Sequence, residues 1–330
     1  MPILSTLLHA THFTRPLLST LVPTVALAFT LQGLTAIPSI ALQTERFYDL
    51  SGSLTYLSCT ALSLYLPFLR ARQATLSAGL AAPPAPSILA ALRGAQGAGL
   101  NWRQVFLSAA VAAWASRLGS YLFKRISGDG GRDSRFDGLR GSPPKMLGAF
   151  GAQAMWVSLC LMPVIAVNAL PAATFASLPA AVTLTDLLGV GLWVGGFGFE
   201  VVADMQKNRW VADKKAKKHS EEFLTSGLWS KSRHPNYFGE STLWTGVAAL
   251  SAGVLLSGPG QVGLGLAGLG ALGKVLAGGM CAVSPAFVSF LLLKVSGVPM
   301  SEEKYDKRYG VCIFEQTLRF RDRERSLTTL

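Results

Sequence analysis

Chemically versatile side chains are concentrated in one short segment, SRHPNYFGE, which runs from Ser232 to Glu240. It places an arginine, a histidine, an asparagine, a tyrosine and a carboxylate within nine residues, directly before an apolar stretch. Together such groups can hold a phosphate, hydrogen-bond an amide or a ribose, and stack against a ring. The alternative is a helix start with aromatic side chains at a membrane interface. We favour a binding site.

The proline of this segment predicts where the next helix begins. Pro235 disfavours helical conformation at the residue before it and is well accepted in the first turn of a helix. Arg233 and His234 are therefore expected on a loop. Asn236 and Glu240 are four residues apart and are expected on one face of the following helix.

A second polar stretch, EVVADMQK, runs from Glu200 to Lys207. Glu200 and Asp204 are four residues apart and would share one helix face. Acidic groups at membrane depth are costly, so each is a candidate for function, although headgroups or Lys207 and Arg209 could also pair with them. The basic run that follows would attract anionic phosphates and is interpreted first as a membrane-surface patch: Lys214, Lys215, Lys217 and Lys218.

The elements that must position these residues are membrane helices. Half of the 330 residues are hydrophobic and only 15% are charged, which is too apolar for a soluble domain of this length. Apolar stretches of roughly the 20 residues needed to span a bilayer recur along the chain. They predict an all-α bundle with about seven spans, at 17–43, 50–69, 104–123, 148–170, 182–203, 241–257 and 262–293. The last stretch is glycine-rich and is compatible with one tilted helix or two shorter pieces.

Basic residues are distributed unevenly between the loops. When alternate loops are placed on alternate sides, 23 of the 30 lysines and arginines fall on the side that holds the C-terminus. The positive-inside rule then predicts a cytosolic C-terminus. The net charge of +12 is explained by these loops, so no nucleic-acid partner is expected. The four cysteines have no metal-ligand spacing, and no metal site is predicted.

Two parts of the chain differ in character. Residues 1–103 hold the first spans and a Pro/Ala-rich stretch, 71–101, that is expected to be a flexible linker. Residues 104–330 hold the polar segments and are predicted to form the catalytic domain.

Several segments together resemble the steroid 5-alpha-reductase superfamily, specifically its steroid-reductase-like membrane branch of unknown function. The resemblance covers about residues 100–320 and depends on these segments, in order: WASRLGSYLFKRI from Trp114, RDSRFDGLR from Arg132, QAMWVSLCLMPV from Gln153, ADMQK from Ala203, GLW from Gly227, SRHPNYFGE from Ser232, and SPAF and SGVPMSE between Ser284 and Glu302.

The resemblance implies a membrane fold whose cytosolic mouth binds NADPH and reduces a carbon–carbon double bond, usually conjugated to a carbonyl, in a sterol or other lipid that enters from the bilayer. Glu240 and Asn236 match cofactor-binding positions, and Glu200 and Asp204 match a pair that contacts the cofactor. The remaining implied cofactor contacts are Lys207, Arg233, His234 and Tyr237.

In related sterol reductases a tyrosine, assisted by an acid, stabilises the carbonyl oxygen as the hydride arrives. Tyr121 is the candidate here, because Arg117 and Arg125 flank it at four-residue spacing on one helix face. The acids available as helpers nearby are Glu45 and Asp49.

Other functions remain open. RHPNYFG also resembles an element of membrane methyltransferases that act on isoprenylcysteine or phospholipids, in which Arg233, His234 and Glu303 would surround S-adenosylmethionine. A non-catalytic lipid-binding protein would keep the fold without the cofactor contacts. A transporter is disfavoured because the polar groups gather at one face rather than at the bilayer midplane. The expected location is the endoplasmic reticulum membrane.

Overall fold

The computed structural model describes residues 2–94, 97–128 and 130–309, and this part of the chain is helical without strands. The helices are α1 (Pro2–Ala10), α2 (Pro16–Ala41), α3 (Tyr48–Ser77), α4 (Ile88–Leu92), α5 (Trp102–Gly128), α6 (Pro143–Asn168), α7 (Ala172–Ala176), α8 (Leu184–Lys215), α9 (Pro235–Leu255), α10 (Gly258–Gly263), α11 (Ala271–Phe290) and α12 (Val298–Tyr309). Three 3₁₀ turns, η1 (Ser134–Phe136), η2 (Gly227–Ser230) and η3 (Ala267–Leu269), and a π-helical turn, η4 (Leu291–Val295), connect them.

Six of the seven apolar stretches each fall on one helix of at least 20 residues, α2, α3, α5, α6, α8 and α9, and the seventh holds α11 together with the end of α10. Five of the described helical segments are long and apolar enough to cross a membrane, namely α2, α5, α6, α8 and the segment Ala271–Glu303. The protein is therefore a multi-pass membrane protein with an all-helical fold. Crossing by α3 and α9 as well stays a prediction.

Aromatic and aliphatic side chains from both parts of the sequence share one core. α2 packs against α6 and α3, α3 against α5, and α9 against α8, α11 and α6. Tyr56, Trp114 and Trp244 come from three of these helices and are each at most 2% exposed. Helices α2 and α3 thus complete the bundle that holds the polar segments.

The closest helix pair is α8 with α9, and small residues explain why. Gly189, Gly196 and Ala203 recur every seven residues on α8, and Gly239 and Gly246 have the same spacing on α9. A Cβ at Gly196 would lie 2.6 Å from the backbone nitrogen of Leu243. Backbone therefore meets backbone along this pair, as small residues allow in membrane helices. Pro235 begins α9, as its position predicts.

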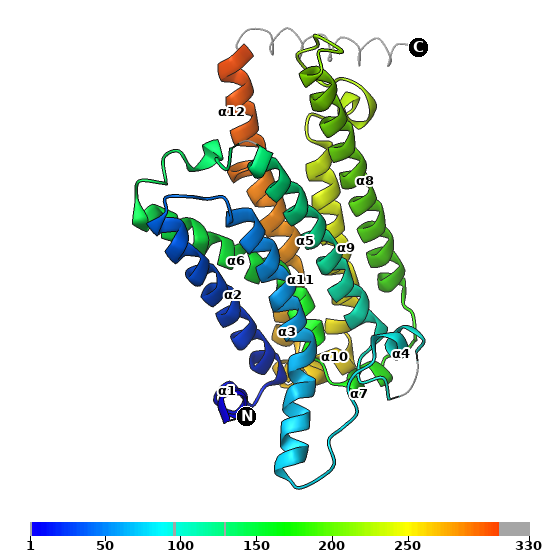
Figure 1. Cartoon of the computed structure of the whole chain (residues 1–330). Helices are drawn as coiled ribbons and strands as arrows, with labels where there is room; N and C mark the ends of the chain where they lie inside the picture. The colour runs from blue at the N-terminus through cyan, green and yellow to red at the C-terminus, as the bar shows by residue number, and fades with distance from the viewer. Residues whose placement is uncertain (1, 95–96, 129, 310–330) are drawn as a thin grey trace, which may run out of the picture.

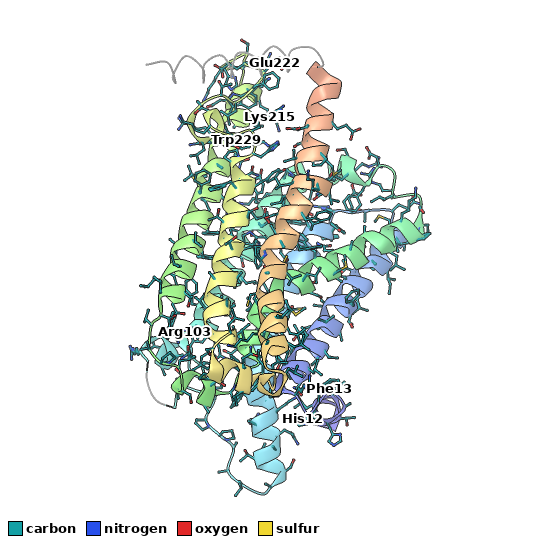
Figure 2. The ribbon with its side chains drawn as sticks, turned by 180° about the vertical axis from the view of Figure 1, so that it is seen from behind. His12, Phe13, Arg103, Lys215, Glu222 and Trp229 are labelled. Atoms are coloured by element: carbon teal, nitrogen blue, oxygen red, sulfur yellow. The ribbon has the colours of Figure 1, made fainter. Side chains whose placement is uncertain are left out.

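The loops predicted to be basic lie together. The α2–α3 connection, η1, the end of α8 and α12 are at one end of the bundle, which we call the basic end, and α1, α4, α7 and α10 are at the other (Figure 1). Trp229, Lys215 and Glu222 lie at the basic end and Arg103 lies near the opposite end (Figure 2). The described loops therefore lie at alternate ends of the bundle, and which end faces the cytosol stays a prediction.

One local expectation was wrong in detail. The stretch 71–101 is not a linker throughout, because α3 continues to Ser77 and α4 packs by Ala91 against Ala98 and Val105. For the last apolar stretch the structure agrees with the second of the two predicted alternatives, two shorter pieces, since α10 ends at Gly263 and α11 begins only at Ala271.

Candidate functional site

Arg117 of α5 lies between the two acids of α8. Its Nη1 donates to Glu200 Oε1 over 2.6 Å, and its Nη2 donates to Asp204 Oδ2. The four-residue spacing puts both acids on the α8 face that meets α5. Glu200 is 3% exposed, and its second oxygen, Oε2, is buried without a hydrogen-bond partner. An unused buried carboxylate oxygen is costly and indicates a place for a donor.

Glu240 of α9 completes this group, which we call the Arg117 layer: Arg117, Glu200, Asp204 and Glu240. Glu240 interacts electrostatically with the other three, yet no hydrogen bond or ion pair with a described residue engages its carboxylate. The layer therefore combines three carboxylates with one guanidinium. Its free oxygens can accept hydrogen bonds from an amide or from hydroxyls.

One helical turn deeper lie three buried hydrogen-bond donors, which we call the donor layer: Tyr56, Trp114 and Trp244. Trp114 precedes Arg117 by three residues and Trp244 follows Glu240 by four, so the two layers share helix faces. The ring of Trp114 lies 5.1 Å from that of Tyr56 and 5.1 Å from that of Trp244.

The polar atoms of the donor layer have no acceptor. Tyr56 Oη, Trp114 Nε1 and Trp244 Nε1 are buried without a hydrogen-bond partner, and the Tyr56 hydroxyl lies beside the thiol of Cys160, a weak acceptor. Each unpaired buried donor costs about 1–3 kcal/mol. Acceptor atoms of a ligand within reach of these donors would remove this cost. The sequence analysis did not predict these residues. Tryptophan within an apolar stretch could have indicated them, because a buried indole N–H needs a hydrogen-bond partner.

The loop before α9 meets the start of α12. Arg233 Nη1 lies 3.2 Å from Glu302 Oε1, and His234 Nε2 lies 3.5 Å from the same oxygen. The His234 ring stacks on Tyr237 with centroids 5.1 Å apart. Burial lowers the pKa of His234 below its usual value, and this outweighs the opposing effect of Glu302. Among described residues the Asn236 side chain has no hydrogen bond.

The predicted catalytic face of α5 is divided among three neighbourhoods. Arg117 belongs to the Arg117 layer. Tyr121 is partly exposed and donates from its hydroxyl to Asn208 Oδ1 over 3.1 Å. Arg125 lies nearer the basic end, 3.6 Å from Asp133 Oδ2. Lys207, on the following turn of α8, lies 4.9 Å from the ring centre of Trp229.

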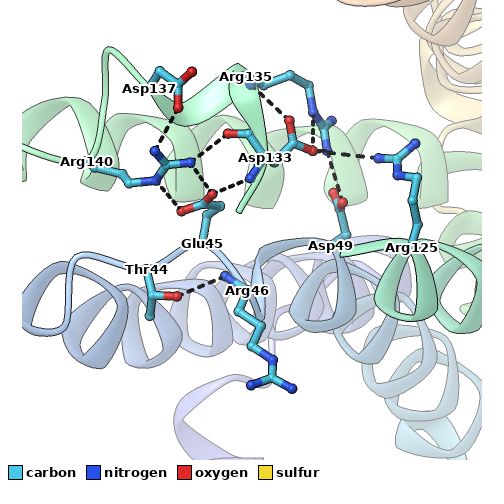
Figure 3. Close-up of polar contacts among 9 residues, drawn as sticks. All are labelled: Thr44, Glu45, Arg46, Asp49, Arg125, Asp133, Arg135, Asp137 and Arg140. Atoms are coloured by element: carbon cyan, nitrogen blue, oxygen red, sulfur yellow. Dashed lines mark hydrogen bonds and ion pairs between the residues drawn. The ribbon is translucent and has the colours of Figure 1, made fainter. Parts of the chain in front are cut away.

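Asp133 belongs to a second charged group, the Glu45 cluster: Glu45, Asp49, Asp133, Arg135 and Arg140 (Figure 3). Arg140 donates from Nε to Glu45 Oε2 over 2.7 Å and from Nη2 to Oε1 over 2.5 Å. The backbone N–H of Asp133 also donates to Glu45 Oε1. Arg135 binds Asp133 and Asp49 through Nη2, over 2.7 and 3.0 Å.

The two acids considered as catalytic helpers therefore hold the α2–α3 turn to the α5–α6 loop. Burial alone would raise the pKa of Glu45, but the hydrogen bonds from Arg140 and from the Asp133 N–H outweigh it and lower that pKa. Glu45 is 1% exposed and each of its oxygens has a donor. Its surroundings fit a structural tie between loops.

The fold and site define a multi-pass helical membrane protein with a buried charged layer near its basic end. A family model described as a protein of unknown function, DUF1295, matches residues 75–259, more than half of the chain, and the protein belongs to this family. The match includes the whole Arg117 layer but neither Tyr56 nor Glu302. No curated protein and no solved structure matches the chain. Across the described residues, no group of histidine, cysteine and acidic side chains is placed to hold a metal ion.

Proposed function

We propose that this protein is an NADPH-dependent reductase of the steroid 5-alpha-reductase superfamily, which reduces a carbon–carbon double bond conjugated to a carbonyl in a sterol or other membrane lipid. The observation that carries the proposal is the stacking of two incomplete layers. Free acceptor oxygens lie in the Arg117 layer, and free donors lie one turn deeper in the donor layer.

The residues near the basic end fit the cofactor. The Glu200 and Glu240 carboxylates would accept from carboxamide and ribose donors, and Asn236 offers a further amide at the start of α9. Arg233 and Lys207 supply positive charge for phosphates on the water side. When bound, the nicotinamide supplies a hydride.

The deeper layer fits the carbonyl of the substrate. Negative charge develops on that oxygen as the conjugated alkene is reduced, and preorganised donors stabilise it. The unpaired Tyr56 hydroxyl and the Trp114 and Trp244 indoles are such donors, in an apolar setting that strengthens them. Tyr56 would be the proton donor to that oxygen. Tyr121, which the sequence predicts for this role, lies nearer the basic end and is the alternative donor.

The arrangement in the membrane belongs to the same proposal. All seven long helices would cross the bilayer, the basic end would face the cytosol, and the membrane would be that of the endoplasmic reticulum. A lipid substrate would reach the donor layer from the bilayer.

A second candidate has its own observation. The Arg117 layer holds three acidic side chains and one arginine, and acidic side chains would suit the sulfonium cation of S-adenosylmethionine in a lipid methyltransferase. The donor layer has no evident task in that chemistry, so we place the reductase first. A non-catalytic lipid-binding protein would leave both layers without a use.

Ligand-induced thermal stabilisation of the purified, detergent-solubilised protein tests the proposal. NADPH should raise the melting temperature more than NADH, and S-adenosylmethionine should not raise it. Glu240→Ala and Asn236→Ala should each weaken NADPH binding by more than tenfold, about 1.4 kcal/mol. Glu221→Ala, at an exposed carboxylate of the α8–α9 loop, is the matched control and should bind normally. Stabilisation by S-adenosylmethionine alone would favour the methyltransferase, and stabilisation by no cofactor would contradict both.

A further inference from the structure

Helix α10 lies at the end of the bundle opposite the basic end (Figure 1). A pocket lies between α10 and the beginning of α11. Its volume is about 580 Å³. Gln261 and Lys274 are its polar lining residues, and the rest of the lining is glycine, alanine and Val262. This pocket has no part in the proposed reaction.

Lys274 is exposed, and no described residue forms a hydrogen bond or ion pair with its ammonium group. It lies in the first turn of α11, where the apolar segment Ala271–Glu303 begins. An unpaired lysine at the end of a span is tolerated when its ammonium reaches the phosphate level of the membrane. On the other side of the α10–α11 connection, the exposed side chain of Arg15 packs near Gly265 and adds a second positive charge.

The start of α11 adds backbone donors to this charge. Gly270 precedes the helix with a φ of +56° and offers no side chain to cap the first N–H groups. A helix N-terminus with unpaired N–H groups favours an anion, and Lys274 lies beside it.

Gln261 supplies an independent sign of a missing ligand group. It is 4% exposed, and its Nε2 donates to the Leu255 carbonyl over 2.7 Å. Its Oε1 has no donor. This oxygen lies against the first turn of α11, because a Cβ at Gly273 would be 2.7 Å from it. A hydroxyl or an amine would satisfy it.

We infer that this pocket binds the headgroup of an anionic phospholipid that carries a hydroxyl, such as phosphatidylglycerol. The phosphate would bind Lys274 and the N-terminal N–H groups of α11, and the headgroup hydroxyl would donate to Gln261 Oε1. The apolar lining at the edge of a span fits a lipid in place, since a free phosphate would leave Val262 and the alanines without a partner.

Lipid binding to the full chain in detergent tests this inference. Phosphatidylglycerol should raise the melting temperature, while phosphatidylcholine and millimolar inorganic phosphate should not. Lys274→Gln should weaken phosphatidylglycerol binding about tenfold, or about 1.4 kcal/mol, and Lys274→Arg should retain it. Lys294→Gln, near the other end of the same apolar segment, is the matched control and should behave as wild type.

Three outcomes would overturn the inference: equal binding by Lys274→Gln and wild type, stabilisation by inorganic phosphate alone, or equal stabilisation by the two lipids. Native mass spectrometry of the wild-type protein repeats the comparison of lipids without any substitution, so a variant that fails to fold does not leave the question open. Because cofactor binding is measured separately, failure here leaves the proposed reductase unaffected.

Discussion

Two groups of acids and arginines lie toward the basic end of this bundle, and they differ in how fully their atoms are used. In the Glu45 cluster each Glu45 oxygen has a donor, and Asp133 and Asp49 are bound by Arg135. In the Arg117 layer one arginine binds two carboxylates, Glu240 has no ion pair with a described residue, and Glu200 Oε2 has no partner. The hydrogen-bonding groups of Glu45 are thus all used within the protein, whereas the Arg117 layer leaves carboxyl oxygens without a donor among the described residues.

The difference separates stability from function. Buried charges stabilise a fold when they are paired and hydrogen-bonded, and removal of one partner is then expensive. Buried charges that are left incomplete reduce stability, which makes them candidates for binding or chemistry. We therefore expect substitutions in the Glu45 cluster to lower stability and substitutions in the two incomplete layers to lower activity.

The largest expected effect is the loss of the Glu45 tie. Glu45→Gln removes the charge that two Arg140 bonds require, and it should lower the free energy of unfolding by about 3 kcal/mol. Thermal unfolding in detergent measures this loss of stability.

Asp137→Asn is the control for Glu45→Gln, since Asp137 binds the same arginine over 2.7 Å but is 67% exposed. Its effect should be below about 1 kcal/mol. Unchanged stability with lost activity in Glu45→Gln would instead make Glu45 the catalytic helper suggested by the sequence.

Next in size is the effect of removing the Tyr56 hydroxyl. Tyr56→Phe should slow turnover about 100-fold, or about 2.7 kcal/mol, because the carbonyl oxygen loses its proton donor. Stability should not fall, since this hydroxyl has no hydrogen-bond partner to lose. Tyr121→Phe is the companion variant and should retain cofactor affinity. If Tyr121→Phe stops turnover and Tyr56→Phe does not, the rim tyrosine is the donor.

Much of the fold follows from patterns that the sequence carries locally. The lengths of the apolar stretches predicted all seven long helices, and Pro235 predicted the start of α9. Hydropathy could not place the break between α10 and α11, because glycine and leucine are compatible with both a helix and a turn. The stretch after α3 was equally ambiguous, since alanine-rich sequence forms either helix or linker.

The site was predictable only in part, because its contacts join residues far apart in the chain. Spacing along α8 identified Glu200 and Asp204, and the segment SRHPNYFGE, in which α9 begins, identified Glu240. Nothing local indicated that Arg117 would meet the two α8 acids, a contact across 83 positions or more. The donor layer depends likewise on three helices, and its lack of acceptors is visible only when all three are packed.

The third effect tests whether the incomplete layers need the close approach of α8 and α9. Gly196→Ala would place a Cβ 2.6 Å from the Leu243 nitrogen, so the helices must separate. We expect a loss of about 2 kcal/mol in stability and weaker NADPH binding, as Glu200 moves away from Glu240. Gly195→Ala meets nothing within 4 Å and should be neutral or stabilising. Equal effects of both substitutions would mean that helix propensity, not packing, is measured.

A smaller effect is expected from neutralising the unpaired acid of the Arg117 layer. Glu240→Gln should weaken NADPH binding about tenfold, or about 1.4 kcal/mol, because an acceptor becomes a weaker one. Its melting temperature should be equal to or above that of wild type, since no described residue forms a hydrogen bond or ion pair with the Glu240 side chain that the substitution could remove. A lower melting temperature would show that Glu240 is paired like Glu45, and the contrast between the two groups would disappear.

The smallest effect, the pH dependence of the Glu45 cluster, follows from the sign of its pKa shift. Because the folded-state pKa of Glu45 is below its usual value, Glu45 contributes stability above the ordinary carboxyl pKa of about 4. That contribution is lost as the pH falls through the lowered value.

The gap in melting temperature between wild type and Glu45→Gln should therefore be constant near neutral pH and shrink below about pH 4. Asp137→Asn should follow wild type throughout. A gap that persists unchanged in acid would mean that Glu45 acts through packing alone, since protonation leaves its shape in place while removing the charge that Arg140 binds.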